Sequence, residues 1–206
     1  MKLYVDSADP TEIGACVAAA GTSGVATSAS LLAAAAERAG AAPRELLRAI
    51  CGVANGPVRV AVAARGDDRA AMLSEARELA AVAANVVVEL PTGEAGLAVT
   101  RSCAGEGIRT AIGGSPTPEQ ALAAARAGAS YVSAPMSRTG FDAIRKLVAL
   151  LRTCDATAEV VAGAIRVPTD VLDAAVAGAH AAAAPAAVLR ELPAESVRNA
   201  NRGGPA

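Results

Sequence analysis

Eight short segments built from β-branched and small apolar residues recur along this chain, and longer segments with helical periodicity separate them. The predicted strands are 2–6, 24–27, 58–63, 85–90, 110–113, 131–134, 160–164 and 179–184, the last of which has an alanine-rich sequence equally compatible with a helix. Alternation of strands and helices predicts a parallel sheet with helical crossovers. Eight units of roughly 25 residues fill the chain as they would fill a compact α/β fold of the (β/α)8 TIM-barrel type.

The helical segments carry recognisable boundaries. A Thr-Pro-Glu start signal at residue 117 opens a helix that ends at Gly128, and Ile144, Leu147 and Leu151 share one face of a later helix. The predicted helices are 31–38, 43–50, 69–84, 117–127, 141–151 and 168–177. An open doubly wound sheet is the alternative, but no GxGxxG follows the first strand and eight strands are many for an open sheet. We expect one barrel domain over residues 1–198 and a disordered tail over 199–206.

Composition excludes several classes of function. The net charge is −1, from 19 basic and 20 acidic residues, and the aromatic residues are two tyrosines and one phenylalanine. This balance predicts no nucleic-acid partner and no membrane surface. The four cysteines form no CxxC pair and His180 is the sole histidine, so we expect no metal site and no cofactor. Unpaired thiols and an acidic N-terminal segment favour the cytoplasm.

In a barrel of this kind, the chemistry takes place at the carboxyl ends of the strands. The polar side chains predicted there are Asp6, Ser28, Ser30, Glu89, Arg138 and Arg166. Arginine holds phosphate through paired hydrogen bonds, while carboxylates and hydroxyls orient sugar oxygens. This set of residues therefore suits a phosphorylated polyol.

Several segments together resemble a known family, the small transaldolases and fructose-6-phosphate aldolases. The segments that carry the resemblance are KLYVDSAD (2–9), GVATSAS (24–30), NVVVELP (85–91), EGIRT (106–110), AGASYV (127–132) with Arg138, and VAGAIR (161–166). They follow the family's order and spacing from the first residue to about Leu192. The resemblance independently implies a (β/α)8 barrel, and it implies that Arg138 and Arg166 bind the substrate phosphate.

One departure from the family bears directly on mechanism. The position of the family's Schiff-base lysine is Glu89, and a carboxylate cannot form an imine with a ketose. Of the two lysines, Lys2 lies four residues before Asp6, at the other end of its strand, and Lys146 is expected to face solvent. Neither replaces the missing amine. Ser28 also stands where the family has asparagine.

Each candidate residue has a structural alternative. Glu89 is either a general acid or base, or a carboxylate that pairs with Arg138 or Arg166. Asp6 is either catalytic, or an N-cap or hydrogen-bond partner of the following loop. Ser28 and Ser30 are either ligands or loop-capping residues. The two arginines either bind phosphate or form ion pairs at the end of the barrel.

Three functions remain open from the sequence. The first is an enzyme that acts on a phosphorylated sugar or related carbonyl compound without a Schiff base, with Glu89 as acid or base. The second is a non-catalytic homologue that binds sugar phosphate or assembles with an active partner. The third is residual transaldolase or aldolase activity through another nucleophile. The sequence also leaves open the choice between a monomer and a homo-oligomer.

Overall fold

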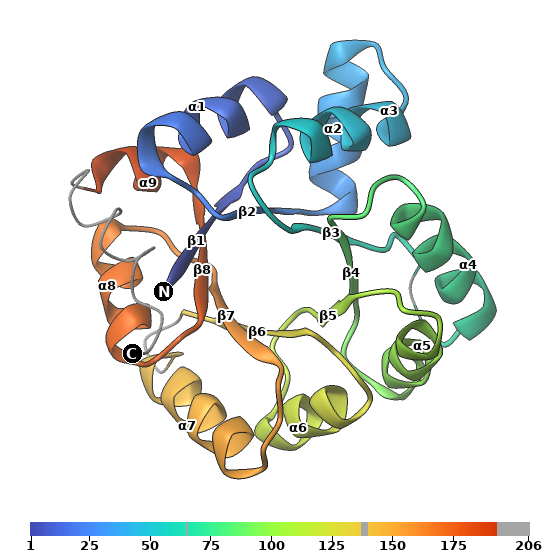
Figure 1. The fold of residues 1–206 in the computed structure, drawn as a ribbon, viewed down its shortest axis with the longest axis vertical. Helices are drawn as coiled ribbons and strands as arrows, with labels where there is room; N and C mark the ends of the chain where they lie inside the picture. Colours follow the sequence, from blue (N-terminus) through green and yellow to red (C-terminus); the bar gives the residue numbers. More distant parts are fainter. Residues whose placement is uncertain (65, 137–139, 193–206) are drawn as a thin grey trace.

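Eight parallel strands close into a barrel, as predicted, and helices surround it (Figure 1). The computed structural model describes residues 1–64, 66–136 and 140–192. Strands that follow one another in the chain are hydrogen-bonded neighbours, and β8 returns to pair with β1, with Lys2 opposite Ala181. This closure rules out the open doubly wound sheet. The predicted tail, 199–206, lies outside the described residues.

The elements follow one another in strict order. They are β1 (Lys2–Asp6), α1 (Pro10–Ala20), β2 (Gly24–Thr27), α2 (Ala29–Ala39), α3 (Pro43–Val53), β3 (Val58–Ala61), α4 (Arg69–Ala80), β4 (Val86–Leu90), α5 (Glu94–Gly105), β5 (Thr110–Ile112), α6 (Pro118–Arg126), β6 (Tyr131–Pro135), α7 (Gly140–Thr153), β7 (Glu159–Gly163), α8 (Pro168–Val176), β8 (Ala181–Pro185) and α9 (Ala186–Glu191). The alanine-rich segment 181–185 is a strand because it is buried between β7 and β1.

The interior of the barrel is filled unevenly. The inward positions of β2, β5 and β8 carry only glycine or alanine, and Tyr4, Tyr131 and Arg59 supply much of the bulk. The ring of Tyr4 takes the space that a side chain on β2 would otherwise fill, since a Cβ added to Gly24 would lie 2.9 Å from it. The centre of this barrel therefore holds large side chains with polar ends beside Val87 and Val161, where branched apolar residues usually dominate.

The outer faces of the strands form the larger core with the helices. Ile13, Leu47, Met72 and Ile144 are fully buried in this layer. Three of the four cysteines are buried there, whereas Cys154 is partly exposed, and all four are free thiols. In the described part of the chain, no helix combines the length and the apolar character that crossing a bilayer requires.

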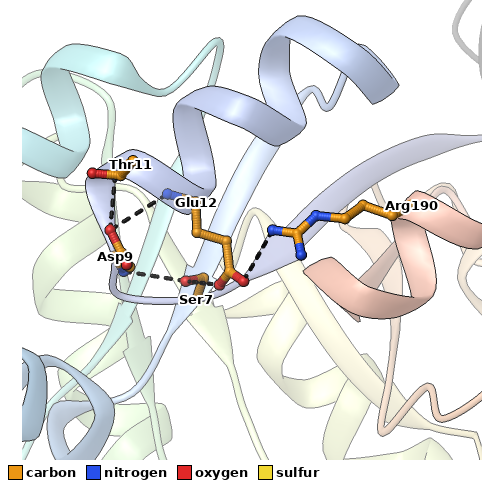
Figure 2. A network of polar contacts seen from close by, with 5 residues as sticks. All are labelled: Ser7, Asp9, Thr11, Glu12 and Arg190. Carbon is orange, nitrogen blue, oxygen red and sulfur yellow. Dashed lines mark hydrogen bonds and ion pairs between the residues drawn. The ribbon is translucent and has the colours of Figure 1, made fainter.

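A polar network fixes the chain where it leaves β1 (Figure 2). Asp9 caps α1 and accepts a hydrogen bond from the backbone N–H of Thr11 at 2.8 Å. The Ser7 hydroxyl donates to Glu12 at 2.7 Å, and Arg190 of α9 donates to the other Glu12 oxygen at 3.4 Å. Because Asp9 is the cap, Asp6 does not serve as the N-cap of this helix.

Candidate active site

A cavity of about 370 Å³ opens at the carboxyl ends of the strands. Its polar lining includes Asp6 from β1, Ser28 from the turn after β2, Arg59 from β3, Glu89 from β4 and Ser133 from β6. Residues far apart in the sequence thus meet at one mouth. The structure brings together Asp6, Ser28 and Glu89 as predicted, and it adds Arg59 and Ser133.

Glu89 forms an ion pair with Arg59 across neighbouring strands. Nη2 of Arg59 donates a hydrogen bond to Oε2 of Glu89. The same nitrogen also donates to the hydroxyl oxygen of Ser133, at 2.5 Å. Arg59 is 3% exposed, whereas the Glu89 side chain is 26% exposed and faces the cavity. The sequence analysis offered Arg138 or Arg166 as a structural partner of Glu89; among the described residues the arginine that contacts Glu89 is Arg59, and Arg138 lies outside these residues.

The sequence contained a signal for Arg59. Residues 58–62 read Val-Arg-Val-Ala-Val, so the arginine is the single charge in a strand that is otherwise apolar. Side chains alternate between the two faces of a strand, and the valines pack outward against the helices. Arg59 must then point into the barrel, where a charge requires a partner of opposite sign.

The absence of a side chain at Gly113 makes room for the Glu89 carboxylate. A Cβ added at Gly113 would lie 2.2 Å from Oε1 of Glu89. Glu89 also borders a second hollow of about 260 Å³, together with Thr92 and Gly114. The glycine that follows β5 is therefore part of the site, since it permits the glutamate to lie where it does.

Asp6 lies at the mouth, where solvent reaches it, with barrel walls around it. Loss of hydration within these walls raises the pKa of Asp6, and the charge of Glu89 raises it further, while Arg59 opposes both. Asp6 and Glu89 are thus close enough for their charges to interact. Two carboxyl groups in one cavity, one of them paired with an arginine, are suited to proton transfer.

The predicted phosphate ligands are not assembled in the described residues. Arg138 lies outside these residues. Arg166 is exposed beyond β7, its backbone N–H donates to Asp170 at 2.8 Å, and it is not among the residues that line the cavity. Convergence of the two arginines on one anion stays a prediction.

Ser28 caps a helix, which was its structural alternative, and Ser30 contacts Ser28. The Ser28 hydroxyl accepts a hydrogen bond from the backbone N–H of Leu31 at 3.1 Å and caps α2. It also lies 3.0 Å from the Ser30 hydroxyl. Ser28 borders the cavity, whereas Ser30 is exposed and is not among the residues that line it. Their role as ligands stays a prediction.

Both lysines are remote from the cavity, as the sequence analysis expected. Lys2 pairs with Glu159 at 2.7 Å, at the opposite end of the barrel. Lys146 is exposed on α7. His180 precedes β8, and its Nδ1 accepts from the backbone of Val160 at 3.0 Å. Among the described residues, no three His, Cys, Asp or Glu side chains gather as they would to hold a metal ion.

The family profile described as "Transaldolase/Fructose-6-phosphate aldolase" matches residues 3–202. The chain belongs to this family. A probable transaldolase from Sorangium cellulosum is 37% identical over 198 residues, covering 93% of this chain and 89% of the relative. A probable transaldolase from Thermus thermophilus is 39% identical over 203 residues, covering 93% of this chain and 90% of the relative.

Two solved structures share the fold of this transaldolase/fructose-6-phosphate aldolase family member at low identity. A structure described as "Native KDPGal structure" is similar with a TM-score of 0.58 and 17% identity, over 98% of this chain and 90% of the other. Thiamine phosphate pyrophosphorylase from Pyrococcus furiosus is similar with a TM-score of 0.62 and 16% identity, over 98% and 94%. At these identities the likeness supports the barrel fold alone.

Proposed function

We propose that this family member acts on a phosphorylated sugar or a related carbonyl compound by acid/base chemistry, without a lysine Schiff base. The observation that carries the proposal is the carboxylate of Glu89, which faces the cavity and is held by Arg59, whose guanidinium also donates to Ser133. Family membership supports a sugar phosphate as the substrate. A positioned carboxylate supports proton transfer as the chemistry.

The two carboxyl groups receive different roles. Glu89, balanced by the positive charge of Arg59, is the base that takes a proton from the carbon beside the substrate carbonyl. Asp6 binds a proton more readily than an ordinary aspartate, because its pKa is raised, and so it is the group that delivers a proton to substrate oxygen. Such a pair supports isomerisation, epimerisation or dehydration of the substrate.

The phosphate is assigned to Arg138 and Arg166, and sugar hydroxyls to Ser28 and Ser30. In support, Gly163 and Ala164 at the end of β7 border the cavity, and Arg166 follows two residues later. A long side chain at that place reaches a phosphate that extends from the mouth towards solvent. The arginine fork then supplies bidentate hydrogen bonds.

The test is exchange of substrate carbon-bound hydrogen with solvent. Dihydroxyacetone phosphate and fructose 6-phosphate are incubated with the protein in D2O, and deuterium uptake beside the carbonyl is followed by NMR. We expect uptake with the wild type, a loss of about 100-fold or more in Glu89→Gln, and no loss in Glu37→Gln, a change on the exposed face of α2. Normal uptake by Glu89→Gln contradicts the proposal.

A second measurement excludes the covalent route. After incubation with fructose 6-phosphate, borohydride reduction and intact mass analysis should leave the mass of the protein unchanged, because neither lysine reaches the cavity. A stoichiometric adduct would mean that the protein retains a Schiff-base nucleophile.

One observation favours the non-catalytic alternative, namely that a buried arginine already engages Glu89. In that case the pair fills the barrel, and the protein binds sugar phosphate or assembles with an active partner. Thermal stabilisation by sugar phosphates without any deuterium uptake identifies this alternative, because selective binding raises the unfolding temperature by mass action.

A further inference from the structure

Removal of a proton beside a carbonyl group leaves negative charge on the carbonyl oxygen. An acid/base mechanism at Glu89 therefore needs a positive group at that oxygen, because the charge that develops in the transition state must be stabilised. The proposed function assigns a base and an acid and leaves this group unassigned.

Among the described residues that line the cavity, Arg59 is the only one with a positively charged side chain. Its guanidinium contacts Glu89 and Ser133 through Nη2, so its charge lies beside the base. The rest of the side chain is held inside the barrel at 3% exposure, and its Nε has no hydrogen-bond partner among the described residues. Arg59 is thus a fixed charge at the edge of the cavity, and its donors are not all used within the protein.

The burial of the Arg59–Glu89 pair differs from that expected of an ion pair with only a structural role. A pair that only fills space is best sealed from solvent and has its remaining donors satisfied, because desolvation of the charges is otherwise not offset. Here the arginine is buried while its partner faces the cavity at 26% exposure. A substrate that enters the cavity meets the carboxylate and the guanidinium side by side.

We propose that Arg59 is a catalytic residue that binds the carbonyl oxygen and stabilises the enolate formed when Glu89 removes the neighbouring proton. The C–H bond breaks and the proton passes to the Glu89 carboxylate. The electron pair of the broken C–H bond forms the C=C bond, and the π electrons of the carbonyl group move onto its oxygen. The guanidinium of Arg59 stabilises the negative charge on that oxygen. Return of the proton to the same carbon regenerates the substrate. Delivery of the proton to the former carbonyl carbon, with transfer of the hydroxyl proton from one oxygen of the enediolate to the other, gives the isomeric α-hydroxycarbonyl compound. Neither course needs an external oxidant or reductant.

This assignment narrows the substrate class. Guanidinium and carboxylate lie together, so they match a carbonyl oxygen and a C–H on adjacent atoms, with Ser133 beside them for a neighbouring hydroxyl. An α-hydroxycarbonyl compound presents these groups in that order. The inference rests on the proposed function, and it adds the electrophile and the α-hydroxycarbonyl requirement.

The test compares Arg59→Lys with Arg77→Lys, a matched change at an exposed ion pair with Glu106. Deuterium uptake by dihydroxyacetone phosphate should fall about 100-fold in Arg59→Lys, because one charged donor is misplaced, and should not change in Arg77→Lys. Binding of phosphoglycolohydroxamate, whose hydroxamate anion resembles the enediolate, should weaken in Arg59→Lys alone. In Arg59→Ala, added guanidinium chloride at low millimolar concentration should restore part of the uptake.

The outcomes separate this inference from the proposed function. Wild-type uptake that persists in a folded Arg59→Lys but is lost in Glu89→Gln overturns the role of Arg59 and keeps that of Glu89. No uptake by the wild type overturns the proposed function and the inference with it. Reduced uptake in Arg59→Lys with unchanged thermal unfolding, together with guanidinium rescue, supports both.

Discussion

The ion pair between Arg59 and Glu89 restricts which substitutions are tolerated at either position. Removing one member of a buried ion pair leaves a charge without a partner, which is more harmful than replacing both. In this barrel the arginine is the buried member and the glutamate is partly exposed. Changes at position 89 are therefore expected to act through Arg59 as well as through the substrate.

We predict that Glu89→Lys alone does not restore aldol chemistry. The new ammonium group would lie beside the Arg59 guanidinium, and the fold should lose about 3 kcal/mol, near the lower end for a broken buried pair. Aldol cleavage of fructose 6-phosphate should stay far below that of an active family member. The charge-reversed double variant Arg59→Glu with Glu89→Lys should recover most of the lost stability in urea unfolding. Equal stability of the single and double variants would contradict this coupling.

Asp6 should give the protein a recognisable pH dependence. Its pKa in the folded protein is raised above the ordinary value of 3.8, so the native state binds this proton more tightly than the unfolded chain. The free energy of unfolding should fall as pH rises from about 4 through the raised pKa, and then level off. Urea unfolding of wild type and Asp6→Asn between pH 4 and 8 measures the difference. A difference that is flat across this range would show that the site does not raise the pKa of Asp6.

The four thiols should react at different rates. Burial raises the pKa of Cys51 and of Cys103 to about 11, and Cys154 is the thiol that is partly exposed. Because the thiolate is the reactive form, iodoacetamide at neutral pH should label Cys154 first, as mapped by peptide mass analysis. Labelling in denaturant provides the control, in which all four should react alike.

At the scale of single elements, Glu89 of β4 packs against Gly113, the residue that follows β5. A methyl group at position 113 would lie 2.2 Å from the glutamate oxygen, so the carboxylate must move. We predict that Gly113→Ala destabilises the protein by about 1–3 kcal/mol and lowers deuterium uptake. Gly52→Ala on α3 has open space around it and should not destabilise the protein.

A double-mutant cycle isolates this contact. In a Glu89→Ala background the obstructing oxygen is absent, so Gly113→Ala should then have little effect on chemical unfolding. The same destabilisation in both backgrounds would mean that its cause is not the contact with Glu89.

Sequence periodicity predicted strands better than helices. All eight strands begin within two residues of their predicted starts, because their buried segments are bounded by glycine, proline or polar residues. Helices α1 and α5, as well as the short α9, were not predicted from the sequence. The first two contain internal glycines and small residues, which blur the contrast between faces. In α5 the glycine is required by packing, since a Cβ at Gly96 would lie 1.9 Å from the carbonyl oxygen of Pro91.

The candidate site was predictable where its residues lie at strand ends. Asp6 and Glu89 lie at or next to the ends of their strands, so their place at the mouth followed from topology alone. The partner of Glu89 did not follow, because Arg59 lies on a different strand, where it is paired with Val87, two residues before Glu89. A search confined to strand ends passes over such a residue.

At the scale of the whole molecule, closure of the barrel joins the two ends of the described chain. The strands β1 and β8 pair along five residues each, and α1 packs against α9, with Glu12 and Arg190 at their contact. A ligand that binds at the mouth touches loops from several strands at once. Its binding should therefore stabilise the fold as a unit.

We predict that a sugar phosphate at 100 times its Kd adds about 2.7 kcal/mol of stability. For a chain of this length this corresponds to a rise in Tm of roughly 5–10 °C. Arg166→Ala should remove most of the rise with fructose 6-phosphate while leaving any effect of dihydroxyacetone, which has no phosphate. An unchanged rise in Arg166→Ala would show that this arginine does not bind the phosphate.

The space beside Gly113 also constrains how such a site arises over evolutionary time. A chain with any side chain at position 113 could not have accepted glutamate at position 89 in its present place, since the Cβ alone would overlap the carboxylate. If an ancestor carried lysine at position 89, we expect the glycine to have been acquired before the glutamate or together with it. Intermediate relatives should have lysine at position 89 and glycine at position 113. No relative in the lineage should combine glutamate at position 89 with a larger residue at position 113.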